Sequence, residues 1–293
     1  MPALTVDALL STWRRTLGEI LPLRPEVAGQ FLSVNIDPHA SSVLEGGLVV
    51  AKRDGPRGWI AALLVEPRLQ GRGLGDRLLK HALDTLARSG VAEVVLGADL
   101  LHLLPGVPEP GPSDFFRRRG FAIEDRLEFD LACSLVDRRA PDELPEVEPA
   151  AHWEEVLEFL AAEFPGRWRW EAEEARRRGG SPSYFLLLRV GGETAGFARV
   201  HHQEPGAPPP GLIAPSGFWS PAFPGYGGLG PIGVGSRWRG RGLGLGLLEA
   251  AMAHLRQLGV AELAVDWTTL TDFYARVGLA PCRAYRRGRL RFS

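Results

Sequence analysis

Two short glycine-rich strings are the residues of this chain best suited to chemistry. They lie 169 positions apart and read Gln70-Gly71-Arg72-Gly73-Leu74-Gly75 and Arg239-Gly240-Arg241-Gly242-Leu243-Gly244. Glycines let the backbone curl closely around a ligand and turn its N–H groups inward. A helix that begins at such a turn adds the positive end of its dipole, which attracts phosphate groups. Both strings therefore predict anion-binding turns, with a plain tight turn and helix cap as the alternative.

The strings do not fit the two commonest phosphate-binding motifs. A P-loop needs Lys-Ser/Thr after its last glycine, and the dinucleotide fingerprint needs a third glycine one position later. Asp76 and Leu245 occupy that position in the two strings. Both motifs are therefore excluded.

The neighbouring elements must hold each string in place. Apolar runs at 59–66 and 228–235 predict a strand before each string. Amphipathic runs predict a helix after each string, over 74–89 in the first case and up to Leu258 in the second. The other expected helices are 6–20, 113–119, 151–163, 168–178 and 271–277, and the other expected strands are 47–52, 91–96, 121–131, 183–190, 194–202 and 261–266.

The repeat extends beyond the glycines. Gly90-Val91-Ala92-Glu93 returns as Gly259-Val260-Ala261-Glu262 at the same offset, which indicates a duplicated domain. Three prolines among charged residues at 138–149 predict a linker. We therefore expect an α/β protein with an N-terminal domain over 1–137 and a C-terminal domain over 150–293.

The composition is that of an ordinary globular protein. Of the 293 residues, 45% are apolar and 24% charged, and the net charge is −1. This balance predicts neither a nucleic-acid partner nor a membrane surface. Cys133 and Cys282 lack the spacing of a disulfide framework or a zinc site, so we expect no metal. The start of the chain has no signal-peptide pattern, which predicts a cytoplasmic protein. The oligomeric state cannot be read from the sequence.

With these strings, the chain resembles the Gcn5-related N-acetyltransferase (GNAT) superfamily, whose pyrophosphate motif is Gln/Arg-x-x-Gly-x-Gly/Ala. The matching segments outside the strings are Leu64-Val65-Glu66-Pro67, Ile232-Gly233-Val234, Phe115–Phe121 and Phe273–Leu279. The resemblance implies two tandem GNAT domains, each with a mixed, mostly antiparallel sheet flanked by helices. It also implies acetyl-CoA as the co-substrate.

The resemblance assigns the coenzyme-binding residues. The backbone of Leu64 and Val65, and of Ile232 and Val234, would hold the pantetheine arm and the acetyl carbonyl. The pyrophosphate would lie on the two turns, whose residues are Gln70, Gly71, Arg72, Gly73 and Gly75 in the first half and Arg239, Gly240, Arg241, Gly242 and Gly244 in the second.

The two halves differ where the family usually places a tyrosine beside the coenzyme sulfur. Tyr274 occupies this position in the second half, and its phenol could protonate the departing thiolate. Phe116 occupies it in the first half and has no proton to give. The alternative for Tyr274 is an ordinary half-buried tyrosine. The C-terminal domain is therefore expected to be the catalyst.

Other polar and aromatic residues are weaker candidates. Asp266, at the end of a strand, could orient the amine or relay its proton, or could simply cap a loop. Asp99 and His102 lie in an expected loop over 99–112 and could replace the missing proton donor in the first half. For the histidine, a solvated loop position is the simpler interpretation. Five aromatic residues could wall an acceptor pocket or merely fix a loop: Phe218, Trp219, Phe223, Tyr226 and Trp267.

The sequence thus predicts an N-acetyltransferase that moves acetyl from acetyl-CoA to the primary amine of a small molecule by direct attack. Two alternatives stay open at this point. One is a non-catalytic acyl-CoA-binding or sensing protein, and the other is an acyltransferase with a longer acyl donor.

Overall fold

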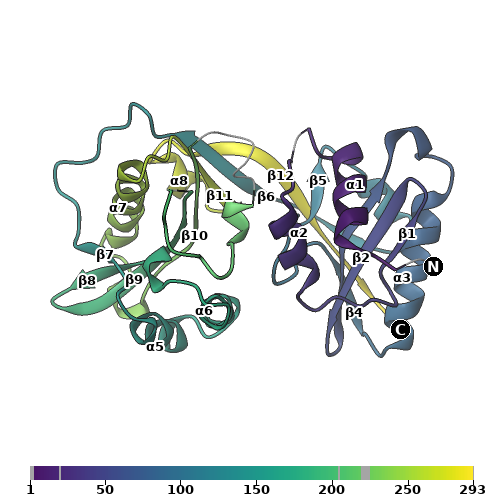
Figure 1. Ribbon diagram of the computed structural model, residues 1–293, viewed down its shortest axis with the longest axis horizontal. Helices are drawn as coiled ribbons and strands as arrows, with labels where there is room; N and C mark the ends of the chain where they lie inside the picture. Colours follow the sequence, from purple (N-terminus) through teal and green to yellow (C-terminus); the bar gives the residue numbers. More distant parts are fainter. Residues whose placement is uncertain (1–2, 20, 204, 219–224, 293) are drawn as a thin grey trace. The chain divides into compact units, whose positions relative to one another are not determined.

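The chain forms two compact units in a computed structural model that describes residues 3–19, 21–203, 205–218 and 225–292. The first unit comprises Met1–Phe129 together with Arg283–Ser293, and the second comprises Asp130–Cys282 (Figure 1). Each unit is a mixed α/β structure with its own strands and helices.

The first unit packs its helices against a mixed set of strands. Its helices are α1 Val6–Thr16, α2 Pro25–Leu32, α3 Leu74–Arg88 and α4 Ser113–Arg117, and its strands are β1 Ser42–Leu44, β2 Gly47–Asp54, β3 Arg57–Val65, β4 Glu93–Leu96, β5 Val107–Glu109, the start of β6 Ala122–Ser134 and the end of β12 Ala280–Arg291. The strand order is β1-β2-β3-β4-β12, with β5 and β6 also beside β12. Among the pairs with a described register, β3 and β4 are parallel and the others antiparallel.

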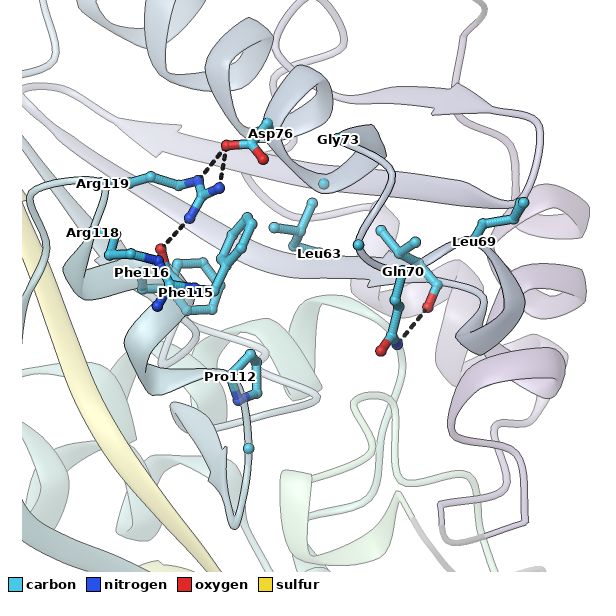
Figure 2. Close-up of a pocket in the computed structure, with 14 residues that line it drawn as sticks. Leu63, Leu69, Gln70, Gly73, Asp76, Pro112, Phe115, Phe116, Arg118 and Arg119 are labelled. Atoms are coloured by element: carbon cyan, nitrogen blue, oxygen red, sulfur yellow. Dashed lines mark hydrogen bonds and ion pairs between the residues drawn. The ribbon is translucent and has the colours of Figure 1, made fainter.

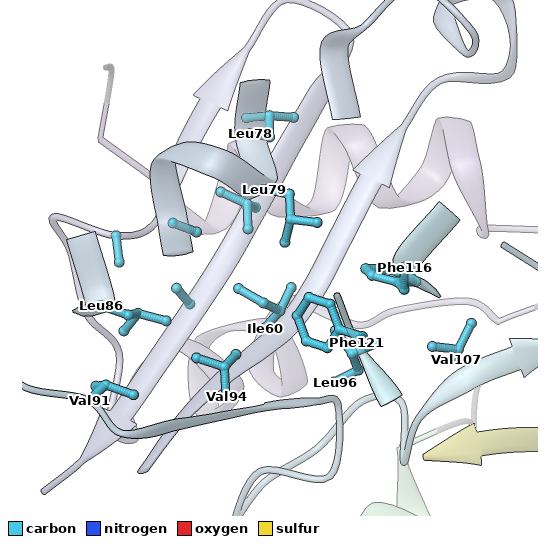
Figure 3. Packing of buried hydrophobic residues seen from close by; sticks show 14 residues of the cluster. Ile60, Leu78, Leu79, Leu86, Val91, Val94, Leu96, Val107, Phe116 and Phe121 are labelled. Carbon is cyan, nitrogen blue, oxygen red and sulfur yellow. The ribbon is translucent and has the colours of Figure 1, made fainter. Parts of the chain in front are cut away.

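The core of the first unit joins α3 to this sheet. Leu78, Leu79 and Leu86 of α3 are buried in one cluster with Ile60 of β3 and Val94 of β4 (Figure 3). These leucines lie on one face of the helix, as the helical period of 3.6 residues requires. Their burial fixes the start of α3, and with it the first glycine string, at the end of β3.

The second unit repeats this plan. Its helices are α5 Trp153–Glu163, α6 Arg167–Arg177, α7 Leu243–Gln257 and α8 Thr271–Ala275, and its strands are the end of β6, β7 Val147–Pro149, β8 Phe185–Val190, β9 Glu193–His201, β10 Tyr226–Val234 and β11 Glu262–Thr268. The strand order is β6-β11-β10-β9-β8-β7. The pair β10 and β11 is parallel, and the pairs from β10 to β7 are antiparallel. An aromatic core that includes Phe159, Phe185 and Phe197 joins α5 to this sheet.

The predicted fold class, α/β with a mixed sheet in each half, is confirmed. The two units also keep the same register. β3 pairs with β4 from Arg57 to Ile60, and β10 pairs with β11 from Tyr226 to Gly228, so both pairings begin 169 positions apart. Helices α3 and α7 begin at the same offset, at Leu74 and Leu243, and each has 15 residues.

The end of the chain adds a strand that the sequence pattern did not predict. Strand β12 pairs with β4 over Arg289–Arg291 and with β5 over Ala284–Arg286. The last residues therefore complete the sheet of the first unit. The segment expected to be a linker, 138–149, groups with the second unit, where Pro145 lies against Gly246 of α7. The domain boundaries at 137 and 150 stay a prediction.

Two kinds of feature are absent from the described part of the chain. None of the helices described is long and apolar enough to cross a membrane. Within the same residues, no group of three or more His, Cys, Asp or Glu side chains is arranged to hold a metal ion.

Candidate active site

The central strand of each unit separates from its parallel neighbour part-way along. The parallel pairing of β3 ends at Ile60, and that of β10 ends at Gly228. A β-bulge follows in both strands, between Ile60 and Ala62 in β3 and between Leu229 and Ile232 in β10. Beyond the bulge, the described pairings of each strand continue on its antiparallel side, and backbone groups on the other side are open to a ligand. The open segments contain Leu64, Val65, Ile232 and Val234.

Each glycine string forms the same turn. Gly71 and Gly73 have φ values of +73° and +79°, and Gly240 and Gly242 both have +76°. A Cβ atom at any of these four positions would meet no other atom within 4 Å. Crowding by neighbouring side chains is therefore not the reason that glycine occupies these positions. The reason is the left-handed φ, together with the open space in front of the backbone.

The first side chain of each string folds back on the central strand. Gln70 Nε2 donates to the carbonyl of Val65 at 3.1 Å, and Arg239 Nε donates to the carbonyl of Val234 at 3.0 Å. These contacts join equivalent positions in the two units. They fix the turn so that the first N–H groups of α3 and α7, which lack partners within their helices, face the open space.

In the first unit this space is a cavity of about 640 Å³. Its lining includes Leu63, the glycine turn and Phe115 (Figure 2). Arg119 closes one side, because its guanidinium lies over the Phe115 ring and forms an ion pair with Asp76. A turn that can bind anions, beside a cavity of small-molecule size, fits the pyrophosphate and pantetheine arm of a coenzyme.

An aromatic pair lies over the helix start in both units. Phe115 approaches within 3.4 Å of a Cβ position on Gly75, and Phe273 within 3.9 Å of one on Gly244. The rings of Phe115 and Phe116, and of Phe273 and Tyr274, are edge to face with centroids 5.1 Å apart in both cases. Tyr274 thus has the place in the second unit that Phe116 has in the first.

The hydroxyl of Tyr274 is held in its neutral form. The side chain is 5% exposed. Burial, and to a smaller extent the negative charge of Asp266, raises the pKa of Tyr274 above its ordinary value. A phenol in this environment keeps its proton at neutral pH and can donate it.

Asp266 lies beside the bulge of the central strand. Its Oδ1 atom is 3.2 Å from the position that a Cβ on Gly230 would take. The structure therefore brings Asp266 and Tyr274, which the sequence singled out separately, within electrostatic range of each other beside β10. The equivalent of Asp266 in the first unit, 169 positions earlier, is Gly97, which has no carboxylate.

Gly230 provides a test of this placement. We expect Gly230→Ala to lower kcat/KM about tenfold, because a side chain at φ +146° is strained and its Cβ would displace the carboxylate of Asp266. The measurement is the rate of thiol release from acetyl-CoA. Gly29→Ala is the matched control, since a Cβ there meets nothing within 4 Å. Wild-type kinetics for Gly230→Ala would show that turnover does not depend on the carboxylate of Asp266 lying beside Gly230.

Three charged residues of the second unit were not predicted as site residues. Arg199 on β9 and Glu171 on α6 form a buried ion pair, with exposed fractions of 2% and 1%. Arg167 on α6 shares the carboxylate of Glu171 and lies over the Trp267 ring. A charged residue inside the apolar run of β9 was the one available signal for Arg199.

The polar candidates of the first unit lie in different surroundings from those expected. Asp99 and His102 are both 2% exposed, because the loop after β4 folds back on the strand end. The solvated position expected for the loop histidine is therefore wrong. Asp99 instead forms a buried ion pair with Lys52, at 2.6 Å.

The loop aromatics divide into three groups. Phe218 and Tyr226 are buried, and the Tyr226 hydroxyl donates to the carbonyl of Ser216, so these two fix the loop. Trp267 is half-buried and has a φ of +45°, which is rare for a bulky residue. Trp219 and Phe223 lie outside the described residues.

Comparison with known proteins identifies the family. Residues 22–102 and 153–279 match the Acetyltransferase (GNAT) family. The chain belongs to this family and is an acetyl-CoA-dependent N-acetyltransferase with two GNAT segments.

The similar sequences include two mycothiol acetyltransferases. The protein from Thermobispora bispora is 30% identical over 231 residues, which cover 75% of this chain and 70% of that one. The protein from Parafrankia sp. is 28% identical over 257 residues, which cover 78% of this chain and 75% of that one.

Solved structures share the fold at lower identity. A GCN5-related glucosamine N-acetyltransferase region of a fungal multi-domain GH3 β-N-acetylglucosaminidase has a TM-score of 0.84 and 24% identity; the match covers 99% of this chain and 38% of that one. A tandem GNAT protein from the clavulanic acid biosynthesis pathway has a TM-score of 0.64 and 17% identity, with 99% and 97% of the two chains covered.

Proposed function

We propose that the second unit transfers acetyl from acetyl-CoA to the primary amine of a small molecule, by direct attack of the amine on the thioester. The observation that carries this proposal is the meeting of Tyr274 and Asp266 at the bulged strand β10, beside the second glycine turn. The first unit has Phe116 and Gly97 at these two positions and offers neither a proton donor nor a carboxylate there.

Each part of this site has one task in the reaction. The glycine turn of residues 239–244 binds the pyrophosphate, and the open edge of β10 orients the pantetheine arm. Backbone N–H groups of β10 polarise the thioester carbonyl as the amine attacks its carbon. Asp266 orients the amine and accepts the proton that it loses. Tyr274 donates a proton to the sulfur as the carbon–sulfur bond breaks, so that coenzyme A leaves as a thiol.

A small-molecule acceptor is supported by the relatives. The similar sequences are named mycothiol acetyltransferases, and the fungal structure is named for glucosamine. We propose no metal, nucleic acid or membrane in the reaction, and a cytoplasmic location. An acetyl donor is favoured over a longer acyl chain, and comparison of acetyl-CoA with butyryl-CoA tests this preference.

The first unit has a different proposed task. Its turn and cavity fit the coenzyme, but Phe116 has no proton to transfer. We propose that it binds acetyl-CoA without transferring the acetyl group. Non-catalytic binding, which was an alternative for the whole chain, is thus retained for this unit alone.

Replacement of Asp266 tests the proposed role of its carboxylate. We expect Asp266→Asn to lower kcat/KM for the amine about 100-fold, because the amide cannot accept the proton. The measurement is thiol release with a panel of glucosamine, spermidine, L-lysine and phenethylamine. Asp142→Asn is the control, since Asp142 is 88% exposed and pairs with Arg139 at the surface. Full turnover by Asp266→Asn would remove Asp266 from the mechanism.

A further inference from the structure

An ion pair in the lining of the first-unit cavity joins the start of α3 to the end of α4. Arg119 Nε donates to Asp76 Oδ1 at 2.6 Å, and Asp76 is in the first turn of α3 (Figure 2). Arg119 Nη1 donates to the carbonyl of Phe115 at 2.5 Å, and the guanidinium lies 3.5 Å from the centroid of the Phe115 ring. Asp76 and Arg119 line the cavity together with the glycine turn. The guanidinium is therefore held in place beside the proposed coenzyme site.

The duplication shows that the fold does not require this ion pair. The residue 169 positions after Asp76 is Leu245, at the start of α7. The counterpart of Arg119 in the matching segment Phe273–Leu279 is Val277, which is 2% exposed. Both members of the pair are thus replaced by apolar residues in the second unit. Side-chain exposures of 24% for Arg119 and 54% for Asp76 also make the pair a weak source of stability, because water screens exposed charges.

The carboxylate of Asp76 opposes the binding of a phosphate group at the first turn. A helix N-terminus attracts anions, and Asp76 already places a negative charge in the first turn of α3. A phosphate on the adjacent glycine turn adds a second negative charge near the first, and like charges repel. The first turn of α7 contains no acidic residue. The first unit therefore needs a positive charge at its turn that the second unit does not need.

Arg119 supplies this charge and has N–H groups that are not yet used. A guanidinium carries five N–H donors. Arg119 directs Nε and Nη2 to Asp76 and one N–H of Nη1 to Phe115, which leaves donors for another acceptor. Arg118 also lines the cavity, but its counterpart in the second unit is Arg276, so an arginine at that position is common to both units. The charged residues that distinguish the two sites are therefore Asp76 and Arg119.

We propose that Arg119 is a coenzyme-binding residue of the first unit that the second unit lacks. Asp76 holds the guanidinium over the Phe115 ring in the empty site. When the coenzyme binds, Arg119 donates to one of its phosphate groups, and the Asp76 carboxylate weakens the binding that the arginine strengthens. This inference rests on the proposed binding of acetyl-CoA by the first unit. It explains why Asp76 and Arg119 occur together in one unit and are both replaced in the other.

Calorimetric titration with coenzyme A tests the proposal in the full chain. The parent variant carries Gly240→Val and Gly242→Val, which remove the second site. Adding Arg119→Met is expected to raise Kd about tenfold, because a hydrogen bond between charged groups is lost. Adding Asp76→Asn is expected to lower Kd about threefold, because the carboxylate no longer repels the phosphate. A merely structural ion pair would be broken by both changes, so the opposite signs identify ligand binding.

Arg117→Met is the matched control, and a second ligand identifies the phosphate group. Arg117 pairs with Asp114 on α4 and is not among the residues that line the cavity, so Kd should stay at the parent value. Titration with 3′-dephospho-CoA then divides the two sources of phosphate. An effect of Arg119→Met that persists assigns the contact to the pyrophosphate, and an effect that disappears assigns it to the 3′-phosphate.

Failure of the inference and failure of the proposed function give different results. Equal Kd values for Arg119→Met and its parent would overturn the inference while the first unit still binds coenzyme A. Equal or weaker binding by Asp76→Asn would also overturn it, and this variant decides the question if Arg119→Met does not fold. A parent variant that binds no coenzyme A would instead overturn the proposed coenzyme site of the first unit, and the inference with it.

Discussion

Replacement of Tyr274 with phenylalanine is expected to lower kcat about 100-fold or more, with little change in KM for acetyl-CoA. The phenol is buried, and its pKa is raised by that burial and by the charge of Asp266. It therefore keeps its proton through the neutral range. Loss of this proton should not lower kcat at any pH below about 10, which is the ordinary tyrosine pKa. Steady-state kinetics across this pH range provide the measurement.

Tyr184→Phe is the matched control for this prediction. Tyr184 is also buried in the second unit, and its hydroxyl donates to the carbonyl of Pro208. The control should lose one hydrogen bond and some stability but keep kcat. Equal kcat values for Tyr274→Phe and the wild type would contradict a general-acid role and leave Tyr274 as a packing residue.

The two glycine turns have the second large expected effect. The wild-type chain should bind two molecules of coenzyme A, one at each turn. Replacement of two glycines of one turn with valine should abolish binding at that turn and leave binding at the other. Gly240→Val with Gly242→Val is expected to abolish turnover, whereas Gly71→Val with Gly73→Val should keep it. Valine is strained at these φ values of +73° to +79° and would fill the space in front of the turn.

Calorimetric titration with coenzyme A and the thiol-release rate together check this prediction. Gly90→Val and Gly259→Val are the matched controls, because both glycines have left-handed φ and open surroundings but lie after α3 and α7, away from the turns. Loss of turnover in the first-unit variant, with its second-unit coenzyme still bound, would show that the first unit takes part in the reaction.

Local features of the site were accessible from the sequence because short-range rules determine them. A glycine string between an apolar strand and an amphipathic helix predicts left-handed turns, and the φ values of Gly73 and Gly242 follow from it. The repeat at 169 positions likewise predicted matching strand–turn–helix units. The contrast between Tyr274 and Phe116 needed only the two aligned aromatic pairs.

Features that depend on distant segments were not accessible in this way. The segment of β12 carries many arginines and has no clear strand pattern, and its Arg291 pairs with Glu93 across 198 positions of the chain. Burial of Asp99 depends on a loop that folds back to bring it to Lys52 of β2. Pairings of this kind leave no periodicity in the chain.

By itself, the sequence predicted two glycine turns of matching conformation, and it placed Tyr274 in the second half where the first half has Phe116. Tertiary structure decided that the carboxylate of Asp266 lies beside β10, near Tyr274. The physical reason is the range of the forces involved. Backbone conformation at a turn is set by the few residues that form it, whereas Asp266 of β11 and Tyr274 of α8 come near each other only in the folded chain.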